Sequence, residues 1–323
     1  MTGIDQAYHS AHYYPYASGV YDTRPGLYKL GTDLGNGMAD TRIFQPDRYW
    51  KQYRANKEAC RRENFDKYVC YHRQESDILG KIGLFIAEKL CQEQPQLYST
   101  EEHGRYTIFS STLSREHITF DPSGRLTDNC TYANLWDAMA FQVQEDIAIW
   151  QFDGERDWMS AIHLCAPNHW APQDKIGSPF SAVHVPVAGM EKMRKRYQPM
   201  LKTLLKGGSY VRFAWGLSTD TRLNHHPVPP PGIDKQDWQG RSFDPDDPTL
   251  YVRTERQTLT GFPRLGAVLF SIRTYFEEVA KLPKKKKVHL MKAIDSMSKD
   301  SLQYKGLGDS ASQVKNFLAS EAK

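Results

Sequence analysis

Three stretches in the second half of the chain carry the pattern of long strands. YVRFAWGL (210–217) directly follows Gly207 and Gly208, while YVRTERQTL (251–259) and LGAVLFSIRTY (265–275) flank the turn GFPR. All three are rich in the β-branched and aromatic residues that favour strands. The last two stretches therefore predict a hairpin, and the first predicts a further strand.

Helical and strand patterns alternate over much of the remaining chain. The spacing of apolar residues predicts helices over 47–62, after Ser76, and over 135–144 and 189–205. A period nearer two predicts strands over 106–111, 117–120, 146–152 and 158–166. We therefore expect an α+β fold.

Composition divides the chain into three parts. Residues 1–40 carry tyrosines among Gly, Pro and Asp without a regular period, and we expect an irregular arm over the main body. Residues 41–280 form the main domain, in which 224–248 is an unusually long polar loop. Residues 281–323 form a basic, helical tail, whose lysine run PKKKKV (283–288) we interpret as a solvated connection between helices.

Charge, hydropathy and cysteine content exclude several classes of protein. The chain has 42 Lys and Arg against 38 Asp and Glu, spread along its length, so a nucleic-acid partner is not expected. Mean hydropathy is −0.64 and the start MTGIDQAYHS is polar, so neither a membrane span nor a signal peptide is expected. Five cysteines without a C-x-x-C pair indicate reduced thiols. These features predict a soluble, cytoplasmic protein without an iron–sulfur cluster of its own.

No short catalytic signature is present in the sequence. Walker A, G-x-G-x-x-G, G-x-S-x-G and H-E-x-x-H motifs are all absent, which disfavours nucleotide-dependent enzymes. His225 and His226 have no acidic or cysteine partner at metal-ligand spacing, so we interpret them as surface histidines.

His184 lies between Val183 and Val185 in SAVHVPV, a stretch that we expect to be extended and to end at Pro186. A satisfied core histidine is the commoner outcome in such a setting. A neutral imidazole held by a stiff backbone in an apolar pocket is also what a haem ligand requires. The residues alone leave both interpretations open.

Charged residues also fall within the three predicted strands. Alternation places Arg253 and Glu255 on one face and Arg256 on the other. Arginines pair well with carboxylates such as haem propionates, and equally well with acidic side chains on a sheet surface. The arginines concerned are Arg212, Arg253, Arg256 and Arg273.

Four blocks of sequence resemble the signature of the haem-dependent oxidative N-demethylase family, in the same order and at similar spacing. They are VQEDIAIW (143–150), KIGSPFSAVHVPVAGM (175–190), VRFAWGL (211–217) and RTERQTLTGFPRLGAVLFSIRTY (253–275). The resemblance covers about residues 40–280. It implies a PAS-like domain with a mixed or antiparallel sheet, surrounding helices and a haem b pocket between sheet and helices.

The resemblance also implies roles for individual residues. His184 takes the position of the axial iron ligand, with His163, His169 and His225 as alternatives. Glu255 takes the position of the catalytic acidic residue, and Asp146 is the next candidate. The residues expected to bind the cofactor beside His184 are Lys175, Arg212, Arg253, Arg256 and Arg273.

The implied activity is that of a haem-dependent monooxygenase, which removes a methyl group from a small N-methylated amine with O2. The chain carries no flavin, nicotinamide or cluster motif, so electrons would come from a separate flavin and iron–sulfur reductase. The alternative is a haem-binding, sensing protein without turnover, and a weaker one is a scaffold without haem. The substrate and a homo-oligomeric state are left open.

Overall fold

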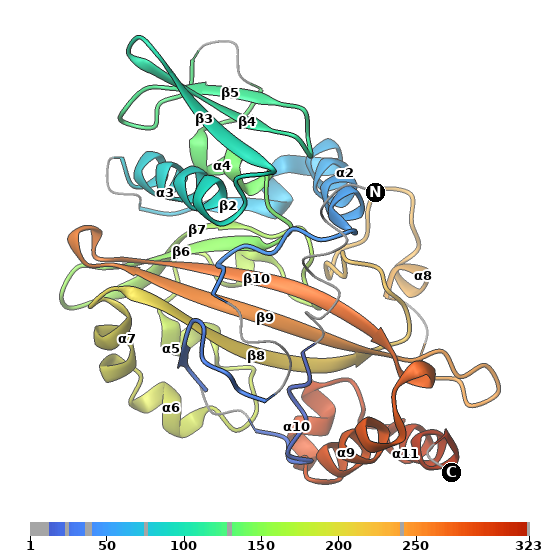
Figure 1. Ribbon diagram of the computed structural model, residues 1–323. Coiled ribbons are helices and arrows are strands. Elements are labelled where there is room, and N and C mark those ends of the chain that lie inside the picture. The colour runs from blue at the N-terminus through green and yellow to red at the C-terminus, as the bar shows by residue number, and fades with distance from the viewer. Residues whose placement is uncertain are drawn as a thin grey trace.

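The computed structural model describes residues 13–22, 26–35, 41–73, 77–127, 131–239 and 242–321. Within them, a seven-stranded antiparallel sheet has the order β1-β8-β9-β10-β6-β7-β2, and a three-stranded antiparallel sheet has the order β3-β4-β5. Helices cover both faces of the larger sheet (Figure 1). The expected α+β fold is confirmed.

The longest strands are consecutive neighbours in the larger sheet. Every residue of β9 from Tyr251 to Gly261 pairs with β8, and every residue of β9 pairs with β10. The strands of the larger sheet are β1 (Tyr28–Lys29), β2 (Val69–Tyr71), β6 (Asp146–Phe152), β7 (Asp157–His163), β8 (Gly208–Ser218), β9 (Tyr251–Phe262) and β10 (Ala267–Glu278), and those of the smaller sheet are β3 (Tyr98–His103), β4 (Tyr106–Ser111) and β5 (His117–Phe120).

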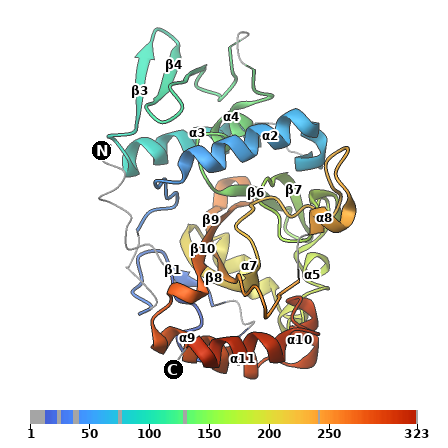
Figure 2. The ribbon, with the colours of Figure 1, turned by 90° about the vertical axis from the view of Figure 1, so that its right-hand side faces the viewer.

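The helices form three groups around the larger sheet (Figures 1 and 2). One group lies with the smaller sheet on one face, a second lies on the opposite face, and the C-terminal helices lie beyond the ends of β8 and β9. In chain order they are α2 (Trp50–Tyr68), α3 (Ile78–Glu93), α4 (Leu135–Ala140), α5 (Phe180–Val183), α6 (Glu191–Lys195), α7 (Gln198–Leu204), α8 (Lys235–Gln239), α9 (Lys284–Asp295), α10 (Lys299–Tyr304) and α11 (Ala311–Glu321).

The two faces of the larger sheet have different surroundings. The face that carries Ile147, Ile149 and Leu269 packs against apolar side chains of α2, α3 and α4, and we call it the core face. Helix α3 contributes an apolar stripe at helical spacing, which includes Ile82 and Ile86. The opposite face, which carries Arg253 and Glu255, is called the cavity face below.

The cavity face is apolar along only part of its length. Near β6 and the start of β10, Trp150 and Val268 pack against Val183 of α5 and Leu204 of α7. The side chains of Trp150 and Val268 lie on the same face of the sheet as the charged side chains of β9. The apolar side chains that cover this face do not extend to β9's charged residues. This gap in the apolar cover leaves room for a functional site.

Two expectations about the C-terminal half are wrong. The run 283–288 is not a solvated connection, because it begins α9 and its lysines find acidic partners. Lys286 forms an ion pair with Glu277 of β10 at 3.0 Å, and the buried Lys287 forms one with Glu321 of α11 at 3.1 Å. The helix predicted over 189–205 is two helices, α6 and α7.

The predictions of reduced cysteines and of no membrane-spanning helix can be compared with the structure over the described residues. Cys60, Cys70, Cys91 and Cys165 are free thiols there, whereas Cys130 lies outside the described residues. In the same part of the chain, no helix is long and apolar enough to cross a membrane.

A buried lysine fixes the connection between α4 and β6. The ammonium of Lys57, on α2, donates hydrogen bonds to the carbonyls of Ala140 at 2.7 Å, Val143 at 3.0 Å and Glu145 at 2.5 Å. Burial lowers the pKa of Lys57, although the nearby Asp146 opposes this effect. Three buried carbonyls therefore depend on one side chain.

We predict that Lys57→Met destabilises the protein by about 2–4 kcal/mol, because the three carbonyls lose their donor and cannot reach water. The free energy of unfolding, measured with urea, checks this. Lys51→Met, at an exposed position of the same helix, is the control and should change it by less than about 0.5 kcal/mol. Equal effects of the two substitutions would contradict the conclusion that the three carbonyls depend on Lys57.

Candidate functional site

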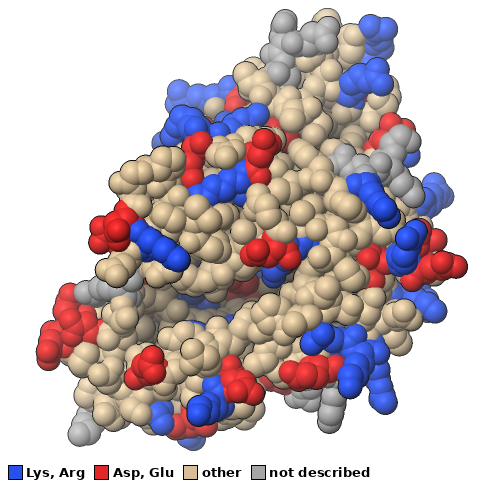
Figure 3. All heavy atoms as spheres, turned by 180° about the vertical axis from the view of Figure 1, so that it is seen from behind, with Lys and Arg blue, Asp and Glu red and all other residues tan. Residues whose placement is uncertain are grey.

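The floor of the candidate site is a patch of the cavity face where β8 has small residues. Glu255 lies opposite Ala214 of β8 and Thr274 of β10, and Arg253 lies opposite Gly216. Small residues beside long charged ones leave space above the sheet. Figure 3 shows the side of the molecule opposite to that of Figure 1, hollowed, with basic and acidic atoms in its depth.

Three cations converge on Glu255 from different parts of the chain. They are Arg212 of β8, Lys175 after a 3₁₀ helix (Pro172–Asp174), and Lys305 after α10. Burial lowers the pKa of Arg212 and Lys305, and lowers that of Lys175 to about 8, although Glu255 attracts all three charges. The site therefore has a surplus of positive charge.

These cations lack the partners that buried charges usually have. The buried Nε of Arg212 has no hydrogen-bond partner among the residues that the structure describes. Lys305 Nζ makes cation–π contacts, 5.8 Å from the centre of the Tyr21 ring and 5.5 Å from that of the Tyr304 ring. Lys175 Nζ lies 3.9 Å from the centre of the Trp170 ring, a cation–π contact. Since unpaired buried charges are costly, this arrangement indicates a site for an anionic group.

His184 lies at the end of α5, so the predicted extended stretch is wrong here. Pro186 disfavours helical geometry at Val185, and the helix ends with His184 as its cap residue. The ring lies against that of Phe180, with ring centres 4.1 Å apart and the planes tilted by 32°, and Nδ1 lies 2.8 Å from the Phe180 carbonyl oxygen. A carbonyl can only accept, so Nδ1 carries the proton and Nε2 keeps its lone pair.

The electrostatic surroundings keep this imidazole neutral. Burial lowers the pKa of His184 to about 4, the bond to the Phe180 carbonyl opposes this shift, and the charges of Lys175 and Arg212 lower the pKa by smaller amounts. A neutral imidazole whose other nitrogen donates to a carbonyl is the usual state of a metal-binding histidine. His184 is therefore chemically ready to bind a metal through Nε2.

Two features hold α5 in place. Asp157 Oδ2, on β7, accepts hydrogen bonds from the Phe180 amide at 2.6 Å and from Trp150 Nε1 at 3.1 Å. Gly177 has a φ of +75°, and a side chain there would meet the His72 ring. The KIG block thus forms a turn that requires glycine and leads into the helix that ends at His184. Sequence patterns gave no sign of the role of Asp157.

Arg253 is held by a chain of contacts that includes His225. Its guanidinium donates to His225 Nδ1 at 3.2 Å and to the Ala166 carbonyl at 2.8 Å, while Nε lies 3.9 Å from Glu255 Oε1. Because Nδ1 accepts, His225 Nε2 carries the proton and donates to Asp220 at 3.1 Å. The prediction that His225 and His226 are surface histidines is wrong, because both side chains are buried.

Arg256 and Arg273 lie away from the site, on the core face. Arg256 donates to the carbonyls of Arg42 and Ile43, and Arg273 forms an ion pair with Asp47 at 2.5 Å. The structure thus brings Arg212, Arg253, Glu255, Lys175 and His184 together but does not bring these two arginines to them. Their contacts connect the segment before α2 to the sheet.

The other candidates also differ in position. His163 lies on the core face, 3.5 Å from Asp137, and its pKa is raised to about 9 although burial opposes the shift, because Cys165 and Asp137 outweigh it. Both carboxylate oxygens of Asp146 accept backbone N–H groups, of Cys165 and Ala166, each at 2.8 Å. Asp146 therefore positions the segment that follows β7.

His169 lies beside His225, with ring centres 5.2 Å apart.

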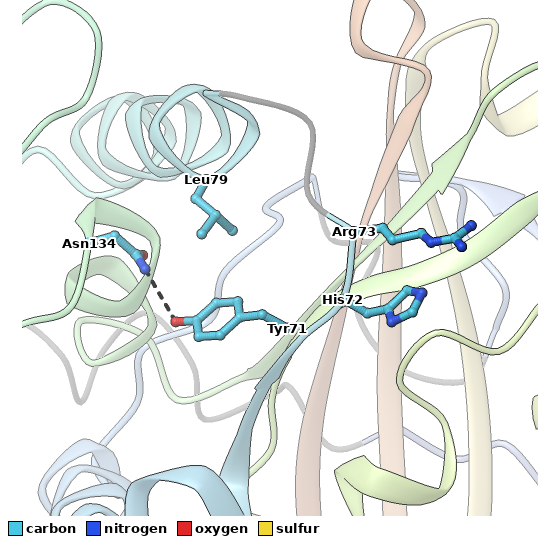
Figure 4. Close-up of a pocket in the computed structure, with 5 residues that line it drawn as sticks. All are labelled: Tyr71, His72, Arg73, Leu79 and Asn134. Atoms are coloured by element: carbon cyan, nitrogen blue, oxygen red, sulfur yellow. Dashed lines mark hydrogen bonds between the residues drawn. The ribbon is translucent and has the colours of Figure 1, made fainter.

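A separate pocket of about 290 Å³ lies between β2, α3 and α4 (Figure 4). The Asn134 amide donates to the Tyr71 hydroxyl at 3.2 Å, while His72 and Arg73 point to the other side of the strand. None of the candidate residues lines this pocket. It is therefore not the candidate site.

Comparison with known protein families identifies the family of this chain. The family described as haem-dependent oxidative N-demethylase, alpha subunit-like, matches residues 36–315. The chain belongs to this family. A comparison with curated proteins gave no match.

A haem-dependent oxidative N-demethylase, alpha subunit-like protein needs a haem site, and the residues present fit one. Haem iron requires a single protein nitrogen in addition to the porphyrin, and His184 Nε2 offers a free lone pair. Haem also carries two propionates, which match the surplus positive charge of Arg212, Lys175 and Lys305. Within the described ranges, no group of three His, Cys, Asp or Glu side chains forms an alternative metal site.

The lowered pKa of His184 predicts how the stability of the apoprotein depends on pH. The unfolded chain protonates this residue near its ordinary pKa of 6.5, whereas the native protein does so only near pH 4. Between these values the unfolded chain binds more protons, so acidification favours unfolding.

We therefore expect the free energy of unfolding to decrease between pH 7 and pH 4, and to decrease less in His184→Asn, which does not titrate. The two decreases should differ by about 1–2 kcal/mol, since the ring is partly screened by solvent. Urea denaturation at a series of pH values measures both. Equal decreases would contradict the lowered pKa.

Proposed function

We propose that this chain binds haem b through Nε2 of His184 and removes a methyl group from a small N-methylated amine with O2. The observation that carries the proposal is the state of His184, a neutral imidazole whose Nδ1–H is bound to the Phe180 carbonyl. The family match supports haem-dependent oxidative demethylation in general. The assignment to His184, the haem type and the substrate class are our proposal.

Different residues on the cavity face bind different parts of the haem. Arg212 and Lys175 pair with the propionates, which removes the cost of burying their charges. The Phe180 carbonyl fixes the orientation of the His184 ring and makes Nε2 a better donor. When bound, haem supplies the activation of O2 that oxidises an N-methyl group.

Glu255 is proposed to bind the substrate. Its Oε2 accepts a hydrogen bond from Gln257 at 3.1 Å, while Oε1 is 3.9 Å from Arg253 Nε and keeps capacity to accept another. A carboxylate so placed binds a protonated amine and can take its proton, which leaves the nitrogen lone pair free. Arg253, held by His225 and Ala166, limits the positions that Glu255 can adopt.

Two further parts of the proposal follow from the family resemblance. The larger sheet with α5, α6 and α7 corresponds to the PAS-like haem domain, within residues 41–280. Electrons come from a separate flavin and iron–sulfur reductase, because the chain has no motif for either cofactor.

We predict that His184→Ala removes haem binding and the Soret band, because Nε2 of His184 keeps its lone pair, whereas both ring nitrogens of His225 are bound, to Arg253 and Asp220. His169→Ala and His225→Ala serve as controls and should retain haem, although the second also disturbs Arg253. Absorbance after titration with haemin measures all three. Full haem binding by His184→Ala, with loss in His169→Ala or His163→Ala, would refute the assignment.

We predict that Glu255→Gln keeps its haem and its thermal stability but loses about 10²-fold in turnover, the scale of a lost acid–base group. Formaldehyde release from a panel of N-methylated amines, with a ferredoxin-type reductase as electron donor, measures turnover. Glu278→Gln, at the surface end of β10, is the matched control. Normal turnover by Glu255→Gln would leave this residue structural, and haem binding without turnover by the unaltered protein would favour a sensor.

A further inference from the structure

Lys305 belongs to the C-terminal segment, which packs beyond the ends of β8 and β9. Helices α9 and α11 share an apolar cluster with Trp215 and Val252, which includes Leu290 and Val314. This packing attaches the segment firmly to the strands that carry Arg212 and Glu255. A residue at the right position in the segment can therefore reach the cavity.

The turn after α10 fixes Lys305 in such a position. Lys305 caps the helix, Gly306 follows with a φ of +69°, and the amide of the buried Leu307 donates to the Leu302 carbonyl at 2.8 Å. This six-to-one bond after a left-handed glycine is the Schellman arrangement, which gives the turn a single geometry. The position of Lys305 is thus defined by backbone structure.

The side chain of Lys305 lies on the cavity face. A Cβ built on Gly216 would be 3.8 Å from Lys305 Cδ and 4.0 Å from Nζ. Gly216 and Arg212 are four residues apart on β8, so their side-chain directions share one face. Lys305 Nζ therefore lies above the strand on the same side as Arg212, within van der Waals contact of a Cβ at position 216.

We propose that Lys305 and Arg212 together bind a carboxylate, and that this carboxylate is a propionate of haem. The inference rests on the proposed function, and it makes the C-terminal segment part of the cofactor site. Arg212 Nε has no hydrogen-bond partner among the described residues, and Lys305 Nζ contacts the rings of Tyr21 and Tyr304. Glu255, which attracts both cations, is also attracted by Arg253 and Lys175. A carboxylate of the ligand adds a second negative charge beside these cations and reduces the surplus of positive charge.

The rate of haem release to excess apomyoglobin tests this inference without any turnover. Lys305→Gln should release haem about 10-fold faster than the unaltered protein, as expected for a lost charged hydrogen bond. Lys305→Arg should stay close to the unaltered protein, and so should Lys299→Gln, at an exposed position of α10. Unchanged circular dichroism and thermal unfolding confirm that Lys305→Gln is folded.

Haem dimethyl ester, in which both propionates are blocked, distinguishes the sources of the carboxylate. Lys305→Gln and the unaltered protein should release this ester at the same rate. The inference is overturned if the substitution leaves haem release unchanged, or if it speeds the release of both forms equally. If Lys305→Gln instead alters only the KM for amines that carry a carboxylate, the lysine binds substrate and the inference is again wrong. Failure of the unaltered protein to bind haem refutes the proposed function itself.

Discussion

Strand β9 is hydrogen-bonded on both sides, to β8 and to β10, and this double pairing determines the chemistry of each face of the sheet. A shift by one residue would move Glu255 to the core face and Arg256 into the cavity. The register instead places Arg256 beside Arg273, where backbone carbonyls and Asp47 accept hydrogen bonds from their terminal NH groups. The cavity face is then left with Arg253 and Glu255, above small residues of β8.

The cavity carries more positive charge than the protein itself neutralises. Arg212, Lys175 and Lys305 all lie in the field of a single carboxylate, Glu255, and burial lowers the pKa of each. Such a surplus costs stability, which the fold recovers elsewhere through apolar packing and saturated groups such as Lys57. A ligand with carboxylates relieves this cost on binding, so the same charges that weaken the apoprotein strengthen its hold on haem.

The sequence predicted the local features well and the long-range ones poorly. Alternation correctly placed Arg253 and Glu255 on one face, because the period of a strand is local. It could not predict that Arg273 aligns with Arg256, which depends on the register between strands, nor that Lys305 reaches Gly216 from 89 residues away in sequence. The valines around His184 favoured an extended stretch, but Asp157, from another strand, caps a short helix there. The fold also buries His225, between Asp220 and Arg253, although composition had placed it at the surface.

The central claim is that the cavity face holds haem with one histidine ligand from this chain. The most direct measurement is the absorbance spectrum of the purified protein reconstituted with haemin, recorded as prepared, after dithionite and after carbon monoxide. The account predicts a Soret band with one equivalent of haem, and a ferrous carbon monoxide spectrum typical of a histidine ligand and an open sixth position. The absence of stoichiometric haem binding, or a carbon monoxide spectrum typical of a thiolate ligand, would contradict it.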